Sequence, residues 1–194
     1  MTTSHLLYLH GFRSSPQSAK ARQMAAHVAQ HHPQVRFWCP QLPPSPQAAM
    51  ALVAQGVAAW PGSAMAVIGS SLGGFYASWV AQHKGCPSVL LNPAVHPARD
   101  LERYIGEQTV WHDPSEHFYF RPEYIDELRA LDTSGHAPAA PELAIIAQGD
   151  EVLDWREMAA RYPQARQLVQ EGGEHALLNF ADYLPTITDF LKLV

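Results

Sequence analysis

The 194-residue sequence is poor in cysteine, with only Cys39 and Cys86. Their separation does not match the spacing of a metal site, and two thiols do not make a disulfide framework, so we expect free thiols in a reducing compartment. The sequence also lacks an apolar run long enough to span a bilayer, and residues 1–5 lack the basic and apolar regions of a secretion signal. These absences predict a cytoplasmic chain without a membrane span.

Charged residues are also scarce. Asp, Glu, Lys and Arg make up 16% of the sequence, and the formal net charge at pH 7 is -5. A chain without a basic excess has no electrostatic reason to bind nucleic acid or an anionic membrane. Hydrophobic residues, at 47%, are abundant enough to bury a core, and the length is that of one domain. We therefore expect a single globular domain over residues 1–194, with no prediction of its oligomeric state.

Short apolar runs typical of buried parallel strands alternate with segments of helical pattern. The expected strands cover residues 6–9, 35–39, 66–68, 88–91, 143–147 and 166–169. This alternation predicts a three-layer α/β fold of about six mostly parallel strands with helices on both faces. Residues 98–140 interrupt it with six aromatic residues and no clear strand. We expect a short helical cap or insertion there, with helical pieces near 100–105 and 122–131.

A Gly-x-Ser-x-Gly pentapeptide, Gly69-Ser70-Ser71-Leu72-Gly73, stands between an expected strand and an expected helix. This context is typical of a nucleophile elbow, in which the central serine occupies a sharp and strained turn. Gly69 and Gly73 leave room where a side chain would collide with the neighbouring strand or helix. We therefore predict that Ser71 is a nucleophile, with the amino end of the following helix facing any negative charge that develops.

A serine hydroxyl is a weak nucleophile and needs a base, which in turn needs a group that fixes its tautomer. The carboxyl ends of parallel strands lie at one edge of a sheet, and His175 follows the last expected strand in a glycine-rich loop. Asp150, at the end of the preceding strand, is the preferred acid. Glu151 and Asp154 are alternatives, although Asp154 also suits the N-cap of the next helix. Serine, acid and histidine follow the chain order of α/β hydrolases.

The loop after the first strand, His10-Gly11-Phe12, is expected at the same edge. We predict an oxyanion hole made by the backbone amides of Phe12 and Leu72. His10 should hold this loop by packing and hydrogen bonding. Together with Gly11 and Ser70 it forms the expected substrate-binding positions.

Residues 112–117 contain two histidines and two acids and superficially suggest a metal site. Their spacing fits neither H-E-x-x-H nor H-x-x-E-H, and Pro114 disfavours a helix through them. We expect a solvated loop there and no metal. The aromatic residues around it either pack an inserted helical pair or wall the apolar side of a substrate pocket.

Five stretches, spread in order over nearly the whole chain, resemble motifs of the α/β hydrolases. They most resemble the small YqiA/YcfP-like (UPF0227) esterase family of bacteria. The stretches are Leu7–Phe12 with Ser14–Pro16, Gly69–Gly74, Leu91–Val95, Gly149–Asp154 and Glu171–Ala176. The resemblance implies the three-layer α/β-hydrolase fold and a serine esterase or thioesterase that acts on acyl esters without a cofactor. It also implies that the triad falls on Ser71, Asp150 and His175.

We therefore expect hydrolysis of a carboxylic (acyl) ester through an acyl-enzyme on Ser71, with a small-molecule acyl ester or thioester as the partner and no cofactor. Two alternatives remain open. One is a thioesterase of the acyl-CoA type that uses the same triad. The other is a non-catalytic binding module on a hydrolase fold, and the intact set of triad residues argues against it.

Overall fold

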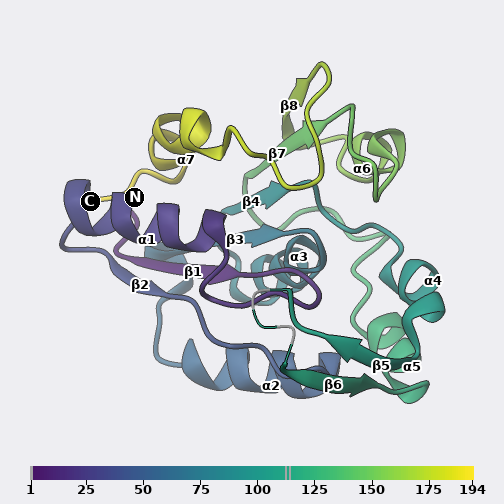
Figure 1. Cartoon of the computed structure of the whole chain (residues 1–194). Coiled ribbons are helices and arrows are strands. Elements are labelled where there is room, and N and C mark those ends of the chain that lie inside the picture. The colour runs from purple at the N-terminus through teal and green to yellow at the C-terminus, as the bar shows by residue number, and fades with distance from the viewer. Residues whose placement is uncertain (1, 112, 114) are drawn as a thin grey trace.

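The computed structural model describes residues 2–111, 113 and 115–194, and a six-stranded sheet lies at its centre (Figure 1). The strands are β1 His5–Leu9, β2 Arg36–Trp38, β3 Met65–Ser70, β4 Ser88–Leu91, β7 Glu142–Ala147 and β8 Arg166–Gln170. They follow the order β2-β1-β3-β4-β7-β8, and each neighbouring pair is parallel. The prediction of about six mostly parallel strands is confirmed.

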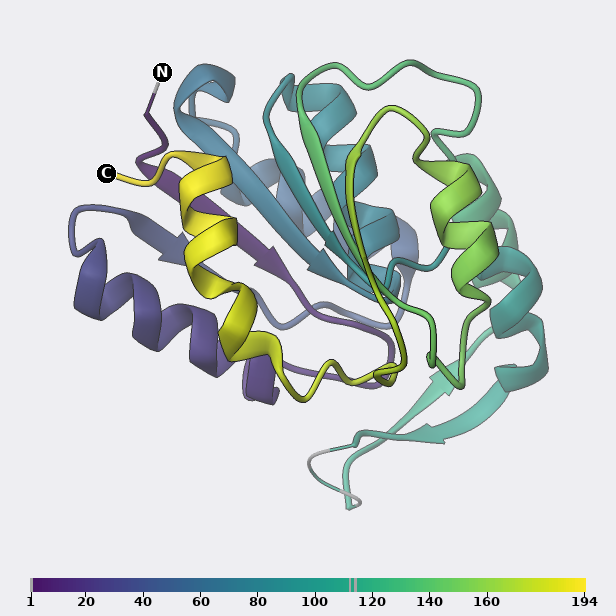
Figure 2. The ribbon, with the colours of Figure 1, turned by 90° about the horizontal axis from the view of Figure 1, so that it is seen from above.

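Helices cover both faces of this sheet (Figure 2). The helices α1 (Ala19–His31) and α7 (Leu184–Leu191) pack on one face, and α2 (Pro46–Gly56), α3 (Leu72–Lys84) and α6 (Trp155–Arg161) pack on the other. Alternate residues of β1 therefore enter two different cores: Leu7 joins the core under α2 and α3, and Tyr8 joins the core under α1 and α7. Burial on both faces explains why the four inner strands, β1, β3, β4 and β7, are short and mostly apolar runs.

The interval 98–140 contains an antiparallel hairpin that we did not predict from the sequence. In it, β5 (Gly106–Thr109) pairs with β6 (His117–Phe120). The expected helical pieces are present as α4 (Pro97–Leu101), which runs into a 3₁₀ turn (Glu102–Tyr104), and as α5 (Glu123–Ala130). The expectation of no clear strand in this interval is wrong, because strands of four residues are too short to show a period of two.

The remaining short elements are 3₁₀ turns at Gly62–Ala64, before β3, and Phe180–Tyr183, before α7. The two ends of the chain lie side by side (Figure 1). Thr3 forms a parallel bridge with Leu193, and its hydroxyl donates to the carbonyl of Leu191 at 2.6 Å. Within the described residues, no helix has both the length and the apolar character needed to cross a membrane.

Candidate active site

Ser71 occupies the turn between β3 and α3 in a strained conformation, with φ 56° and ψ -121°. A Cβ at Gly69 would collide with the carbonyl of Gly73, and a Cβ at Gly73 would collide with the carbonyl of Leu9. Only glycine fits at these two positions, as the sequence predicts. The Ser71 amide donates to the carbonyl of Leu91 at 2.9 Å, which ties the turn to the end of β4.

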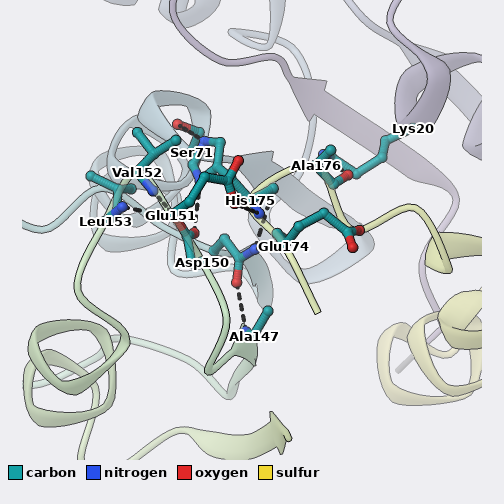
Figure 3. Close-up of polar contacts among 11 residues, drawn as sticks. Lys20, Ser71, Ala147, Asp150, Glu151, Val152, Leu153, Glu174, His175 and Ala176 are labelled. Carbon is teal, nitrogen blue, oxygen red and sulfur yellow. Dashed lines mark hydrogen bonds and ion pairs between the residues drawn. The ribbon is translucent and has the colours of Figure 1, made fainter. Parts of the chain in front are cut away.

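Three side chains from different strand ends form a continuous series of hydrogen bonds (Figure 3). The Oγ atom of Ser71 lies 3.0 Å from Nε2 of His175, and Nδ1 of His175 lies 2.7 Å from Oδ2 of Asp150. The side chain of Asp150 is fully buried, and its Oδ1 accepts from the backbone amides of Val152 and Leu153, each at 2.8 Å. A carboxylate at Nδ1 holds the proton there, so Nε2 is left to accept from the serine hydroxyl.

The other two acids that the sequence leaves open have different partners. Asp154 is the N-cap of α6, where its Oδ1 accepts from the backbone amide of Arg156 at 2.9 Å. Glu151 contacts the backbone of the histidine: its Oε2 accepts from the amide of His175 at 3.0 Å. Asp150 is therefore the acid that contacts the imidazole ring, and Glu151 supports the loop that carries it.

Asn92, directly after β4, supports the same loop, and no role was predicted for it. The Nδ2 atom of this buried side chain donates to the carbonyls of Glu174 and His175 at 3.1 and 3.2 Å. Its Oδ1 accepts from the amide of Ala147 at 2.8 Å. Asn92 thus joins the end of β7 to the histidine loop. Its φ of 40° is a conformation that asparagine tolerates better than most residues.

The loop after β1 lies directly against the serine turn. A Cβ at Gly11 would stand 3.2 Å from Cβ of Ser71 and 3.3 Å from the carbonyl oxygen of Ser70, so a larger residue there would crowd the serine turn. Neither the Phe12 amide nor the Leu72 amide donates to another residue in the described part of the chain. Leu72 is the first residue of α3, where amides have no acceptor within the helix. Both amides therefore lack an acceptor among the described residues.

His10 holds this loop in place. It is 4% exposed; its Nε2 accepts from the amide of Leu42 at 3.2 Å, and its Nδ1 lies 3.0 Å from the carbonyl of Gly11. Because Nε2 accepts, the ring proton sits on Nδ1 and the imidazole is neutral. These contacts fit the predicted loop-holding role of His10. They fasten the proline-rich segment before α2 to the loop that contains Phe12.

Arg13 joins the same loop to the insertion, and it too had no predicted role. Its Nε and Nη2 atoms donate to the carbonyl and the hydroxyl of Thr109, each at 2.6 Å. Its own carbonyl accepts from the amide of Trp111 at 2.9 Å, and its guanidinium carbon lies 4.2 Å from the centroid of the Trp111 ring. The end of β5 is therefore fixed to the residue that follows Phe12.

Aromatic residues of the insertion have two positions relative to this loop. The rings of Tyr104, Phe118 and Phe120 pack around Phe12, with centroid distances of 5.6, 5.9 and 5.2 Å. Tyr104 also lines a cavity at Ser71 together with Trp111, which is 70% exposed. The insertion thus both packs on the loop and walls part of the cleft.

Two cavities meet at Ser71 and His175. One has a volume of about 240 Å³ and lies toward the insertion and the start of α6. The other has a volume of about 310 Å³ and lies toward α1 and the segment after His175, with His10, Gly11 and Ser70 in its wall. The three expected substrate-binding positions therefore share one cavity.

Among the described residues, no group of His, Cys, Asp and Glu side chains is arranged to hold a metal ion. Within the stretch 112–117, His112 and Pro114 lie outside the described residues. Asp113 there accepts from the amide and hydroxyl of Ser115 at 3.0 and 2.6 Å. Both cysteines are free thiols, and burial raises the pKa of each to about 12.

Comparison with known proteins extends these observations. A family model described as "Uncharacterised protein family (UPF0227)" matches residues 5–192. Alpha/beta hydrolase domain-containing protein 10 from mouse is 16% identical with a TM-score of 0.70, covering 98% of this chain and 90% of that one. Est1E from Butyrivibrio proteoclasticus, solved with ferulic acid bound, is 13% identical with a TM-score of 0.73, covering 98% and 87%.

The esterase domain of a Rhodothermus marinus protein is 16% identical with a TM-score of 0.73, covering 99% of this chain and 88% of that one. At these identities the likeness concerns the fold. The chain has the α/β-hydrolase fold over nearly its whole length, as the resemblance of its motifs implied.

Proposed function

The chain belongs to the uncharacterised protein family UPF0227, and from this premise and the geometry of the cleft we propose that it is a serine hydrolase that cleaves carboxylic esters. The observation that carries the proposal is the hydrogen-bonded series from Asp150 through His175 to Ser71, which ends on a serine in a strained turn. Such a series converts a weak nucleophile into a reactive one, because the imidazole takes the serine proton and the carboxylate stabilises the resulting imidazolium.

The acylation step uses each of these groups in turn. As Oγ of Ser71 attacks the ester carbonyl carbon, its proton passes to Nε2 of His175. The carbonyl oxygen becomes an anion and accepts hydrogen bonds from the Phe12 and Leu72 amides, which would otherwise be unpaired. When the intermediate collapses, the bond between the carbonyl carbon and the alcohol oxygen breaks. His175 gives its proton to that oxygen, and the acyl group stays on Ser71.

Deacylation repeats the sequence with water in place of the alcohol. His175 removes a proton from the water as its oxygen attacks the acyl carbon, and the same two amides hold the second oxyanion. Collapse returns the proton to Oγ of Ser71 and releases the carboxylic acid. No cofactor takes part in this scheme.

We place the acyl group in the cavity of about 240 Å³, because its wall is mainly apolar. Leu101, Val152 and Leu153 contribute to it, and Tyr104 and Trp111 close it from the insertion. The segment 98–140 then acts as a cap over the acyl side of a single hydrolase domain. The description of two similar structures as an esterase domain and as Est1E with ferulic acid supports an ester substrate of this kind.

Replacing Ser71 by Ala tests the proposal. The variant should hydrolyse p-nitrophenyl butanoate at least about 10⁴-fold more slowly than the native protein and should keep its circular dichroism spectrum. A fluorophosphonate probe should label the native protein stoichiometrically and the variant not at all. Ser63→Ala, at an exposed position in the 3₁₀ turn before β3, is the matched control and should retain full activity.

Retained activity in Ser71→Ala would end this mechanism, and absence of labelling in the native protein would favour a binding module on a hydrolase fold. Matched butanoyl esters, thioesters and amides, assayed in parallel, decide between ester and thioester hydrolysis. We expect the ester to be the preferred substrate.

A further inference from the structure

The cavity of about 310 Å³ differs in chemistry from the acyl side of the cleft. It opens at Ser71 and His175 and extends between the loop after β1, the start of α1 and residues 176–178. Its wall is more polar than that of the acyl side, although apolar groups still form most of it. Six polar side chains line it: Tyr8, Ser14, Ser18, Lys20, Gln23 and Ser70. The mechanism proposed above uses none of these six groups.

Two oxygens in this wall have no hydrogen-bond partner among residues 2–111, 113 and 115–194. The Oη atom of Tyr8 and the Oε1 atom of Gln23 are both buried and unpaired. Tyr8 is 0% exposed, and burial raises its pKa, so the phenol keeps its proton. The Ser70 hydroxyl is near enough to favour ionisation slightly, but it does not complete a hydrogen bond. Buried polar atoms are nearly always paired, so two orphans beside a reactive serine indicate a ligand that pairs them.

The charge in this cavity is balanced. The Nζ atom of Lys20 donates to the carbonyl of Ala176 at 2.5 Å (Figure 3), and the carboxylates of Asp150 and Glu174 act on it electrostatically. A ligand that enters therefore meets a phenol, an amide and serine hydroxyls rather than an unbalanced cation. Such groups both donate and accept, as the hydroxyls of a polyol do.

We infer that this cavity binds the alcohol part of the ester, and that this alcohol is an uncharged polyol such as a glycerol or sugar unit. The inference rests on the proposed ester hydrolysis. In the acylation step the alcohol oxygen leaves the carbonyl carbon and takes the proton from His175, so the alcohol must lie beside Nε2. Its further hydroxyls then reach Tyr8 and Gln23, after rotation of the long Gln23 and Lys20 side chains at the cavity surface.

Capture of the acyl-enzyme by added alcohols tests this inference. An alcohol that binds as the leaving group also binds in the reverse reaction, as the nucleophile that takes the acyl group. The acyl-enzyme formed from p-nitrophenyl butanoate is offered glycerol or 1-propanol at equal concentration, and the yield of each butanoate ester is measured. Glycerol should yield at least about fivefold more ester than 1-propanol, the effect of one hydrogen bond or more to the bound alcohol.

Tyr8→Phe removes only the unpaired phenol oxygen and should lower the ratio of glyceryl to propyl ester by about fivefold. Gln23→Met, at a half-buried helix position, should also lower this ester ratio, and it provides the test if Tyr8→Phe folds poorly. The matched control is Tyr162→Phe, which removes a buried phenol that pairs with the hydroxyl of Ser78 outside both cavities. This control should keep the native ratio.

Equal yields from glycerol and 1-propanol per primary hydroxyl would overturn the polyol inference while leaving the hydrolase intact. Preferred capture by glycerate, a three-carbon anion, would assign the cavity to an anionic alcohol instead. A native ratio in both Tyr8→Phe and Gln23→Met would remove these residues from the subsite. If no acyl-enzyme and no fluorophosphonate label form, the proposed hydrolysis fails and the inference fails with it.

Discussion

At the scale of single residues, the candidate site depends on side chains that fix other side chains. Asp150 holds the ring of His175, and Glu151 and Asn92 hold its backbone. The contacts of Glu151 and Asn92 span more than twenty residues of sequence, so a local pattern cannot reveal them. The sequence could predict Ser71, His175 and the preferred acid Asp150, because a glycine-flanked turn and loops at strand ends are local features.

Asp150→Asn should separate the acids that the sequence leaves open. The variant keeps the shape of the side chain but favours the wrong tautomer of His175, so kcat for p-nitrophenyl butanoate should fall by up to about 10⁴-fold. Asp154→Asn is the matched control: asparagine also caps a helix, so activity and stability should stay near native values. A comparable loss of kcat in Asp154→Asn alone would reverse the assignment.

Asn92→Ala should destabilise the fold as well as the site. The change leaves the Ala147 amide and the carbonyls of Glu174 and His175 without the partner they share, at a cost of about 2–4 kcal/mol in the free energy of unfolding. Urea denaturation measures this. Asn179→Ala, whose exposed amide donates to Gln170, is the control and should cost less than about 1 kcal/mol. Equal costs in the two variants would contradict the supporting role of Asn92.

At the scale of elements, the parallel sheet was predictable and the hairpin was not. The four inner sheet strands, β1, β3, β4 and β7, are buried on both faces and appear as apolar runs. By contrast, β5 has the sequence Gly-Glu-Gln-Thr, with no such signal. The surroundings of the hairpin support it: Arg13 donates a hydrogen bond to the carbonyl of Thr109, and the rings of Phe118 and Phe120 pack on Phe12. These are tertiary contacts, and they override weak local preferences.

Arg13→Met should loosen the connection between the hairpin and the loop that carries the Phe12 amide. We expect kcat to fall by about tenfold with KM nearly unchanged, since the amide acts on the oxyanion in the transition state. Amide hydrogen exchange in β5 and β6 should become faster. The exposed Arg129, paired with Asp126 on the surface of α5, provides the control Arg129→Met, which should change neither quantity. A rise in KM alone would indicate a binding role for Arg13 instead.

At the scale of the whole molecule, the half-buried charge of Lys20 links stability to pH. Burial lowers the pKa of Lys20 to about 8 from an ordinary value of 10.5, against the opposing effect of Asp150 and Glu174. Between these two pH values the unfolded chain holds a proton that the folded protein has lost. The contribution of Lys20 to the free energy of unfolding therefore increases as pH rises through this window, which stabilises the folded protein.

Comparison with Lys20→Met isolates this effect, because other alkaline titrations occur in both proteins. The free energy of unfolding of the native protein minus that of the variant should increase from about pH 8 to about pH 10.5. Urea denaturation across that range measures it. A difference that stays flat, or shifts toward the variant, would show that Lys20 keeps an ordinary affinity for its proton.

The bridge between Thr3 and Leu193 places both chain ends beside the amino end of β1, whereas Ser71 lies at the carboxyl end of β3. A support or a fused partner attached through either end would therefore stand at the opposite ends of the strands from the cleft. The protein can be tethered in one direction with its reactive side facing free solution. A short linker across the bridge would also turn the chain into a closed ring that can be cut open elsewhere.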